Sequence, residues 1–184
     1  MKRILIFLSI FLFSNSVSAQ TCKVSGNAGT YAGDVIKVYR YTDYITKQHE
    51  NLASVPVDTS GNFSFEIETD HVFEIFLDLN VFLGKLFVEP GKEFKIVLPQ
   101  KTMKHESDIL NPYFEQIEFY IRILHSDNNI TTAVRKLDRL WNESIDIIFK
   151  DPKHINPGVV EKEIQKMTDS VMYFQNDYFE EYKY

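Results

Sequence analysis

Residues 23–98 carry short apolar or alternating runs separated by turn residues, which is the pattern of antiparallel sheets. Within several runs the apolar side chains fall on every second position, so that one face of each strand would meet a core. We expect seven strands, and so many short strands favour a sandwich. The expected strands cover residues 23–27, 34–41, 50–57, 62–68, 72–79, 84–89 and 93–98.

Two polar segments between these runs have the composition of tight turns. In the first, Asp58 can hydrogen-bond the backbone and Gly61 can adopt a positive φ, and alternating side chains follow at 62–68. A calcium loop would need a later glycine and a closing glutamate, so a structural turn is the better interpretation. In the second, Pro90 and Gly91 suit the two central positions of a type II turn.

After Pro99 the apolar period changes from two to about three and a half, which predicts helices. We expect one helix over residues 112–124 behind a cap at Asn111, a second over 131–149, and a third from Pro157 onward. Their apolar stripes are predicted to be core. The stripes are Phe114, Ile117, Ile121 and Leu124; Val134, Leu137, Trp141, Ile145 and Ile148; and Val160, Ile164, Met167, Val171, Phe174 and Tyr178.

The patterns together predict an α+β protein. An N-terminal antiparallel β-sandwich of about seven strands would be followed by a C-terminal region of three helices, which cover one another or pack on the sandwich. We place a signal peptide at 1–19, the β-sandwich domain at 20–100 and the helical region at 101–184.

The first nineteen residues have the layout of a secretory signal peptide. Two basic residues precede an apolar run at 4–13, and Val17 and Ala19 are small residues flanking a cleavage point. The run is shorter than the roughly 20 residues of a membrane-spanning helix, so cleavage before Gln20 is favoured over a retained anchor. We therefore expect an exported protein of the periplasm or cell surface, without a transmembrane span after cleavage.

The single cysteine, Cys22, limits the thiol chemistry of the chain. One cysteine can form neither an internal disulfide, nor a Cys-x-x-Cys redox centre, nor a thiolate zinc cluster. A lipoprotein would carry its lipidated cysteine directly after the cleavage point, whereas Gln20 and Thr21 intervene here. An unmodified thiol is therefore favoured over lipidation of Cys22.

Charge argues against a nucleic-acid partner. The formal charge is −6, and loss of Lys2 and Arg3 with the signal peptide would make it −8. Nucleic acids need a basic face, which this composition does not provide.

No recognised catalytic pattern occurs along the chain, so we expect neither an enzyme nor a cofactor. Serine-hydrolase, zinc-protease, phosphate-loop and dinucleotide motifs are all missing from the sequence. The pairs Glu66/Glu68 and Glu115/Glu118 could in principle flank a glycosidic bond, but solvated charged faces are commoner. The five histidines show no metal spacing; they are His49, His71, His105, His125 and His154.

Aromatic residues are the one compositional excess, at 14% of the chain. Tyr39 and Tyr41 share a face of an expected strand and Tyr44 follows in the turn, which makes the three a candidate surface for a ligand or partner. The alternative is that Tyr39 and Tyr41 pack against the helices with their hydroxyls at the rim.

The order of segments 24–29 (VSGNAG), 35–44 (VIKVYRYTDY), 57–67 (VDTSGNFSFEI) and 86–96 (LFVEPGKEFKI) resembles the N-terminal β-sandwich accessory domain of exported Bacteroidota proteins. That domain, of unknown function, often precedes a thioredoxin-like domain of the TlpA/ResA type. The resemblance implies an accessory role, because the thiol chemistry of that family lies in a later Cys-x-x-Cys domain that is absent here.

The preferred interpretation is a non-enzymatic accessory or interaction module of the cell envelope, with an unidentified protein or glycan as partner. One alternative is a glycan-binding sandwich. The other is the truncated N-terminal part of a thioredoxin-like oxidoreductase, because the segment 176–184 ends while its helical stripe is still running.

Overall fold

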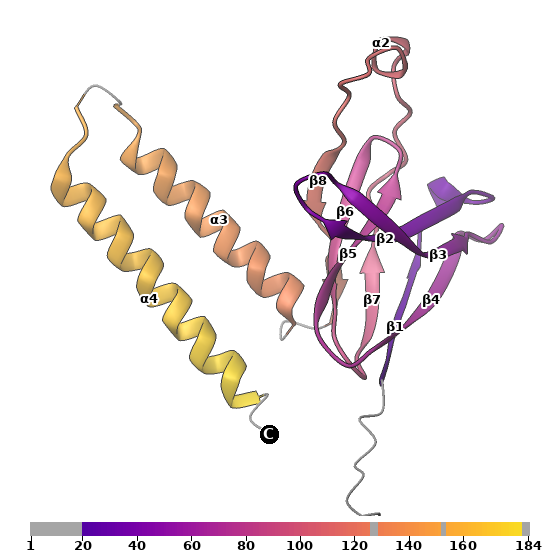
Figure 1. The fold of residues 1–184 in the computed structure, drawn as a ribbon, viewed down its shortest axis with the longest axis horizontal. Helices are drawn as coiled ribbons and strands as arrows, with labels where there is room; N and C mark the ends of the chain where they lie inside the picture. The colour runs from indigo at the N-terminus through magenta and orange to yellow at the C-terminus, as the bar shows by residue number, and fades with distance from the viewer. Residues whose placement is uncertain (1–19, 126–128, 152–153, 182–184) are drawn as a thin grey trace, which may run out of the picture.

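The computed structural model describes residues 20–125, 129–151 and 154–181, so the expected signal peptide lies outside the described part. Strands dominate the N-terminal part and two long helices the C-terminal part, and the chain is an α+β protein as predicted (Figure 1). All seven predicted strands form. The elements are β1 (Gln20–Asn27), η1 (Gly29–Tyr31), β2 (Val35–Asp43), β3 (Gln48–Pro56), β4 (Asn62–Thr69), β5 (Phe73–Leu79), β6 (Phe82–Val88), β7 (Glu93–Val97), α2 (Glu106–Ile109), β8 (Ile117–Tyr120), β9 (Arg122–Leu124), α3 (Ile130–Ile148) and α4 (Pro157–Glu181).

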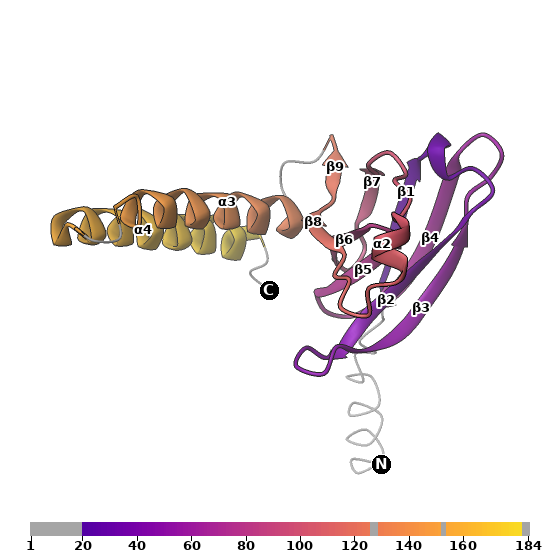
Figure 2. The same ribbon diagram turned by 90° about the horizontal axis from the view of Figure 1, so that it is seen from above.

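The strands form two sheets around one core. One sheet has the order β4-β1-β7-β9, and the other has the order β3-β2-β5-β6-β8. Most neighbours are antiparallel as expected, but β1 runs parallel to β7 and β6 runs parallel to β8, which makes both sheets mixed. Figure 2 shows the two sheets as separate layers, with the α3–α4 hairpin extending to one side.

The core follows the predicted alternation of side chains. On β4, Phe63, Phe65 and Ile67 are buried between the sheets, whereas Ser64 and Glu66 are exposed. Burial of such a side chain stabilises the fold by about 1.5–3 kcal/mol. A shift of this strand by one residue would exchange its two faces, so the alternation also sets the register.

The turn before β4 is structural, as the sequence predicts. The Asp58 carboxylate accepts hydrogen bonds from the backbone N–H groups of Ser60 and Asn62, each at 2.8 Å. Gly61 adopts a φ of 82°, and a Cβ there would lie 2.6 Å from the Cα of Gly29. Glycine is therefore required both by the backbone angle and by the close approach of another loop.

The helix predicted over 112–124 is wrong, because this segment forms β8 and β9. Asn111 caps no helix; its side chain accepts a hydrogen bond from the N–H of Tyr113 in a turn. Phe119, Ile121 and Ile123 point inward at a period of two, and the exposed Ile117 does not join them. The apolar residues of 117–124 fit both periods, and pairing with β6 and β7 selects the strand.

The second and third predicted helices form as α3 and α4, and they pack against each other as an antiparallel hairpin. A polar contact lies within their seam. The Ser144 hydroxyl donates a 2.9 Å hydrogen bond to the buried carboxylate of Glu163, and Lys166 on the next turn lies 3.4 Å from the same oxygen. Because a buried carboxylate needs partners, this contact favours one register of the two helices.

The prediction that the helical stripes are core is only partly right. Leu137, Ile148 and Met167 are half-buried, but Trp141 remains 57% exposed and Ile164 51% exposed. The seam between two helices covers only part of each apolar stripe, and the hairpin projects away from the sandwich instead of folding over it (Figure 1). The side chains of Phe174 and Tyr178 lie outside the described part.

A buried carboxylate joins the hairpin to the sandwich. Glu89, directly after β6, has no exposed surface and accepts a 2.9 Å hydrogen bond from the N–H of Ile130, the first residue of α3. The adjacent Thr131 hydroxyl accepts from the N–H of Phe87 at 2.9 Å. A carboxylate at a helix N-terminus is favourable, because the first N–H groups there have no partner within the helix.

We expect the Glu89→Ala variant to lose about 2–4 kcal/mol of unfolding free energy, since it removes a charged acceptor from a buried N–H group. Glu89→Gln keeps a carbonyl acceptor at the same position and should lose distinctly less. Urea unfolding measures both values, and equal losses in the two variants would argue against the hydrogen bond to Ile130.

Cys22 lies in β1 with its side chain fully buried in the core. Burial raises the pKa of its thiol, although a hydrogen bond with the Glu89 backbone acts in the opposite direction. A lipid on this sulfur would have to displace the surrounding core side chains.

The native protein should therefore react with a thiol reagent such as Ellman's reagent far more slowly than the urea-unfolded chain, because only the thiolate is nucleophilic. No second cysteine contributes to the signal. Rapid stoichiometric labelling under native conditions would contradict the buried placement.

Candidate ligand-binding face

Aromatic and charged side chains from four strands lie on the outer face of the five-stranded sheet. The pairing register aligns Tyr39 of β2, Phe76 of β5, Lys85 of β6 and Tyr120 of β8 in one row. Their chain neighbours point into the core, so these four face away from it. The adjacent row contains Lys37, Asp78, Leu83 and Glu118.

The structure brings the three predicted tyrosines together. Tyr39 stacks on Phe76 with ring centroids 5.7 Å apart, and Tyr41 lies 4.4 Å from the same phenylalanine. Tyr44 packs edge-on against Tyr41, with ring centroids 5.6 Å apart, and 62% of its surface is exposed. Burial, together with contact to Tyr41, raises the pKa of Tyr39. Tyr39 and Tyr41 are both half-buried, and of the three tyrosines only Tyr44 is exposed.

Lys85 lies at the centre of a polar network on this face. Its ammonium group is 3.1 Å from the Glu118 carboxylate and 4.6 Å from the ring centroid of Tyr120. Tyr120 in turn hydrogen-bonds Asp138 of α3, and its pKa is raised first by burial and then by that carboxylate. The network therefore links the sheet to the first helix of the hairpin.

The carboxyl group of Glu74, on this face, has a pKa above its usual value. Burial raises its pKa, the nearby Lys85 ammonium lowers it, and the Glu118 carboxylate raises it again. The Tyr44 hydroxyl donates a hydrogen bond to it, which favours the ionised form. Desolvation has a larger effect than the contacts that favour the ionised form, so the pKa of Glu74 is raised.

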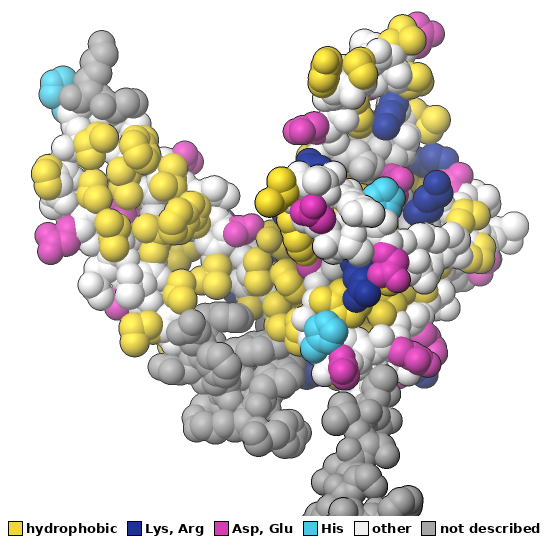
Figure 3. Space-filling view, viewed as in Figure 1, with side chains coloured by type: hydrophobic (Ala, Val, Ile, Leu, Met, Phe, Trp, Pro, Cys, Tyr) yellow, Lys and Arg dark blue, Asp and Glu magenta, His cyan; other side chains and the backbone are white. Residues whose placement is uncertain are grey.

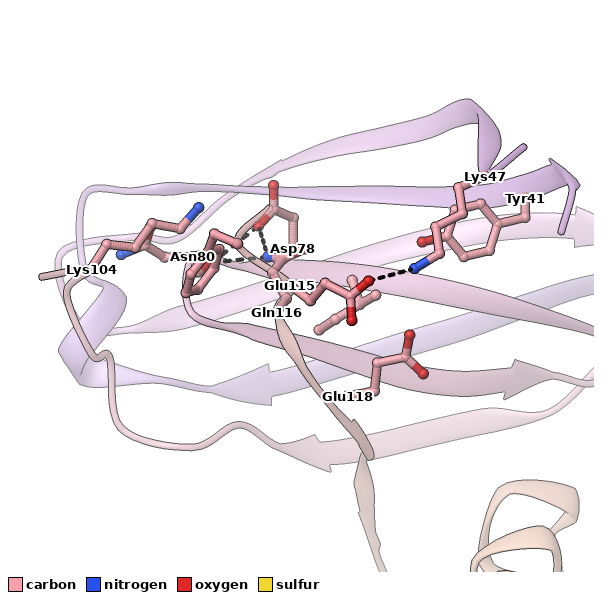
Figure 4. A pocket seen from close by; sticks show the side chains of 10 residues that line it. Tyr41, Lys47, Asp78, Asn80, Lys104, Glu115, Gln116 and Glu118 are labelled. Atoms are coloured by element: carbon pink, nitrogen blue, oxygen red, sulfur yellow. Dashed lines mark hydrogen bonds and ion pairs between the residues drawn. The ribbon is translucent and has the colours of Figure 1, made fainter. Parts of the chain in front are cut away.

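A hollow of about 460 Å³ adjoins the tyrosines (Figure 4). It lies between the β2–β3 turn, the β5–β6 turn and the loop that leads into β8. Its volume falls within the range of small-molecule sites. Its lining residues are Tyr41, Lys47, Asp78, Asn80, Leu83, Lys104, Phe114, Glu115, Gln116 and Glu118.

Gln116 holds the loop side of the hollow in place. Its side-chain amide donates to the Asp78 carboxylate at 2.8 Å and to the backbone carbonyl of Asn80 at 2.9 Å. Asp78 also accepts from the N–H of Asn80 at 3.1 Å, and Asn80 adopts a φ of 70°. Asparagine tolerates a positive φ in a tight turn better than most residues. The hydrogen bonds with Asp78 and Gln116 hold this turn in place.

Of the two predicted carboxylate pairs, only one belongs to this site. Glu115 and Glu118 both line the hollow, but they come from a loop and a strand and not from one helix face. Glu66 lies on the other sheet and pairs with Lys23 at 3.4 Å on the surface. Gln116 is not among the residues predicted from the sequence, because the apolar spacing around it predicts a helix.

Metal binding has no support in the described residues, where no three His, Cys, Asp or Glu side chains are arranged to hold an ion. The described helices also include none with the length and apolar character needed to span a membrane.

A second candidate surface, the hairpin face, is apolar. We define it by Trp141 and Ile145 of α3 and Ile164, Met167 and Val171 of α4, which the helical repeat places on one side of the hairpin. Three of these five side chains are exposed, and hydrophobic side chains gather over both helices in Figure 3. No described part of the chain covers this face.

Comparison of the chain with protein-family models, with curated proteins and with solved structures finds no match in any of the three.

The raised pKa of Glu74 predicts a specific dependence of stability on pH. The native state holds this proton at pH values where the unfolded chain has lost it, so the contribution of Glu74 to unfolding free energy falls as pH rises through that window. Glu74→Gln removes the titration. The variant should be as stable as the parent near pH 4, which is about the usual glutamate pKa. Near pH 7, well above that pKa, the variant should be more stable than the parent.

Urea unfolding across this pH range measures the difference. Glu68→Gln, at an exposed position of the other sheet, controls for loss of a charge. A Glu74→Gln variant that is destabilised more at pH 7 than at pH 4 would show that the contacts to Tyr44 and Lys85 dominate instead.

Proposed function

We propose that the protein is a non-enzymatic accessory module of the bacterial cell envelope that binds a protein partner through the hairpin face. The observation that carries this proposal is the exposure of apolar side chains on one common side of α3 and α4. Trp141 and Ile164 each leave about half of their surface in water. Contiguous apolar patches of this kind are typical of interaction sites.

The geometry of the hairpin supports the proposal of a partner. Two helices share a single seam, here occupied by the Ser144–Glu163 contact, and each has an apolar stripe wider than that seam. A third surface would bury the remainder and thereby gain hydrophobic free energy. The Glu89 hydrogen bond fixes the start of α3 on the sandwich, so the hairpin is presented in a defined direction.

Sequence features support the same proposal. The signal-peptide pattern indicates export, and the resemblance to an accessory sandwich domain of exported Bacteroidota proteins implies a role beside other envelope proteins. Trp141 is the only tryptophan in the chain and lies on the hairpin face, which makes its fluorescence a direct reporter of docking.

A photo-reactive amino acid at position 164 tests the proposal in the envelope of the expressing host. We expect a discrete cross-linked species from position 164 and none from Lys162, an exposed residue two positions away on the same helix. Trp141→Gln should abolish the cross-link from position 164. It should lower the unfolding free energy by no more than about 2 kcal/mol, because about half of the side chain is already in water.

Size-exclusion chromatography with light scattering of the full chain identifies a second copy as the partner if the mass doubles. Equal cross-linking from both positions, or a cross-link that survives Trp141→Gln, would refute the hairpin face as the docking surface.

A further inference from the structure

We infer that the hollow beside Tyr41 is a binding site for a neutral saccharide, which is an activity beyond the proposed protein interaction. The lining of the hollow carries charges of both signs. Lys47 and Lys104 contribute two ammonium groups, and Asp78, Glu115 and Glu118 contribute three carboxylates. An anionic ligand would meet three like charges and a cationic ligand two, whereas a neutral polar ligand would meet none.

The hydrogen-bonding character of the lining selects a ligand rich in hydroxyl groups. Ammonium groups only donate and carboxylates only accept, and the side-chain amide of Asn80 does both. A hydroxyl group also donates and accepts, so a polyol can use both kinds of partner at once. Figure 4 shows Glu115 and Glu118 directed into the hollow from one side and Lys47 reaching over it from the β2–β3 turn.

Tyr41 is an aromatic residue of the lining, and an aromatic ring can pack against the apolar face of a sugar ring. The centroid of the Tyr41 ring lies 4.4 Å from that of Phe76, and the ring forms T-shaped pairs with Tyr39 and Tyr44 at centroid distances of 5.7 and 5.6 Å. These contacts set the orientation of the ring before a ligand binds. A pre-oriented side chain loses little conformational entropy on binding. The aromatic ring, and not the hydroxyl, is the part of Tyr41 that suits the apolar face of a sugar.

The mouth of the hollow can open to a ligand at little cost. Lys47 and Glu115 approach to 3.9 Å across it, and both side chains remain mostly exposed. An exposed ion pair of this kind contributes about 0–1 kcal/mol, so hydroxyl groups of a ligand can replace it. The deeper wall is rigid by comparison, because Gln116 ties the loop to Asp78 and Asn80.

Affinity gel electrophoresis of the full chain tests the inference with soluble neutral polysaccharides built from glucose, mannose, galactose or xylose. Polygalacturonate serves as the acidic comparison. We expect at least one neutral polymer to retard the parent protein. Tyr41→Ala should weaken the apparent affinity at least about tenfold, as for a central contact residue, whereas Tyr41→Phe should retain it.

Two further variants separate a local effect from unfolding. Tyr113→Ala alters an exposed aromatic side chain of the same loop that does not line the hollow, and it should leave retardation unchanged. Glu115→Ala removes an exposed lining group and should weaken binding without a change in the urea midpoint.

Three outcomes would overturn the inference: no retardation by any neutral polymer, retardation by polygalacturonate alone, or equal retardation of the parent and the Tyr41→Ala and Glu115→Ala variants. The hollow and the hairpin face share no residue, so failure here leaves the cross-linking result at position 164 unaffected, and the reverse also holds.

Discussion

Among the steps of the chain from one sheet to the other, the crossing from β8 to β9 is the one that positions much of the rest of the structure. Ile121 separates β8 from β9, is almost completely buried, and donates its N–H to the carbonyl of Lys85 at 2.9 Å. β8 thereby completes one sheet and β9 the other. Gly84 leaves room for this crossing, because a Cβ there would lie 2.8 Å from the Ile121 side chain. The hollow before β8 and the helices after β9 both take their positions from this crossing.

The outer face of the five-stranded sheet shows how such pairing produces a site. Tyr39, Phe76, Lys85 and Tyr120 come from four different strands, and the strand register sets them in one row. Tyr39 and Phe76 then support Tyr41, and Lys85 balances the carboxylates around it. Because the supporting contacts are packed and the accessible groups stand at the edge, the face combines a rigid base with a polar rim.

The hairpin and the sandwich differ in how far they bury their apolar side chains. The sandwich buries its apolar side chains between two sheets and is complete within the described residues. The hairpin has a polar contact in its seam, between Ser144 and Glu163, and keeps apolar side chains such as Trp141 and Ile164 at the surface. Glu89 connects the two parts through the first N–H of α3. This arrangement holds an apolar surface at a distance from the sheet that bears the tyrosines.

The sequence by itself determined the seven strands, the turn at Asp58 and Gly61, and the helices α3 and α4, because period, turn chemistry and capping are local properties of the chain. It also placed Tyr39, Tyr41 and Tyr44 near one another, since they share a strand and its turn. Only the tertiary structure decided that 117–124 is extended, because its apolar spacing fits both periods and long-range pairing with β6 and β7 selects the strand. The same pairing brought Gln116 and Glu118 beside Asp78. The exposure of the hairpin face was likewise beyond the sequence, because an amphipathic stripe specifies that a surface is apolar but not which surface covers it.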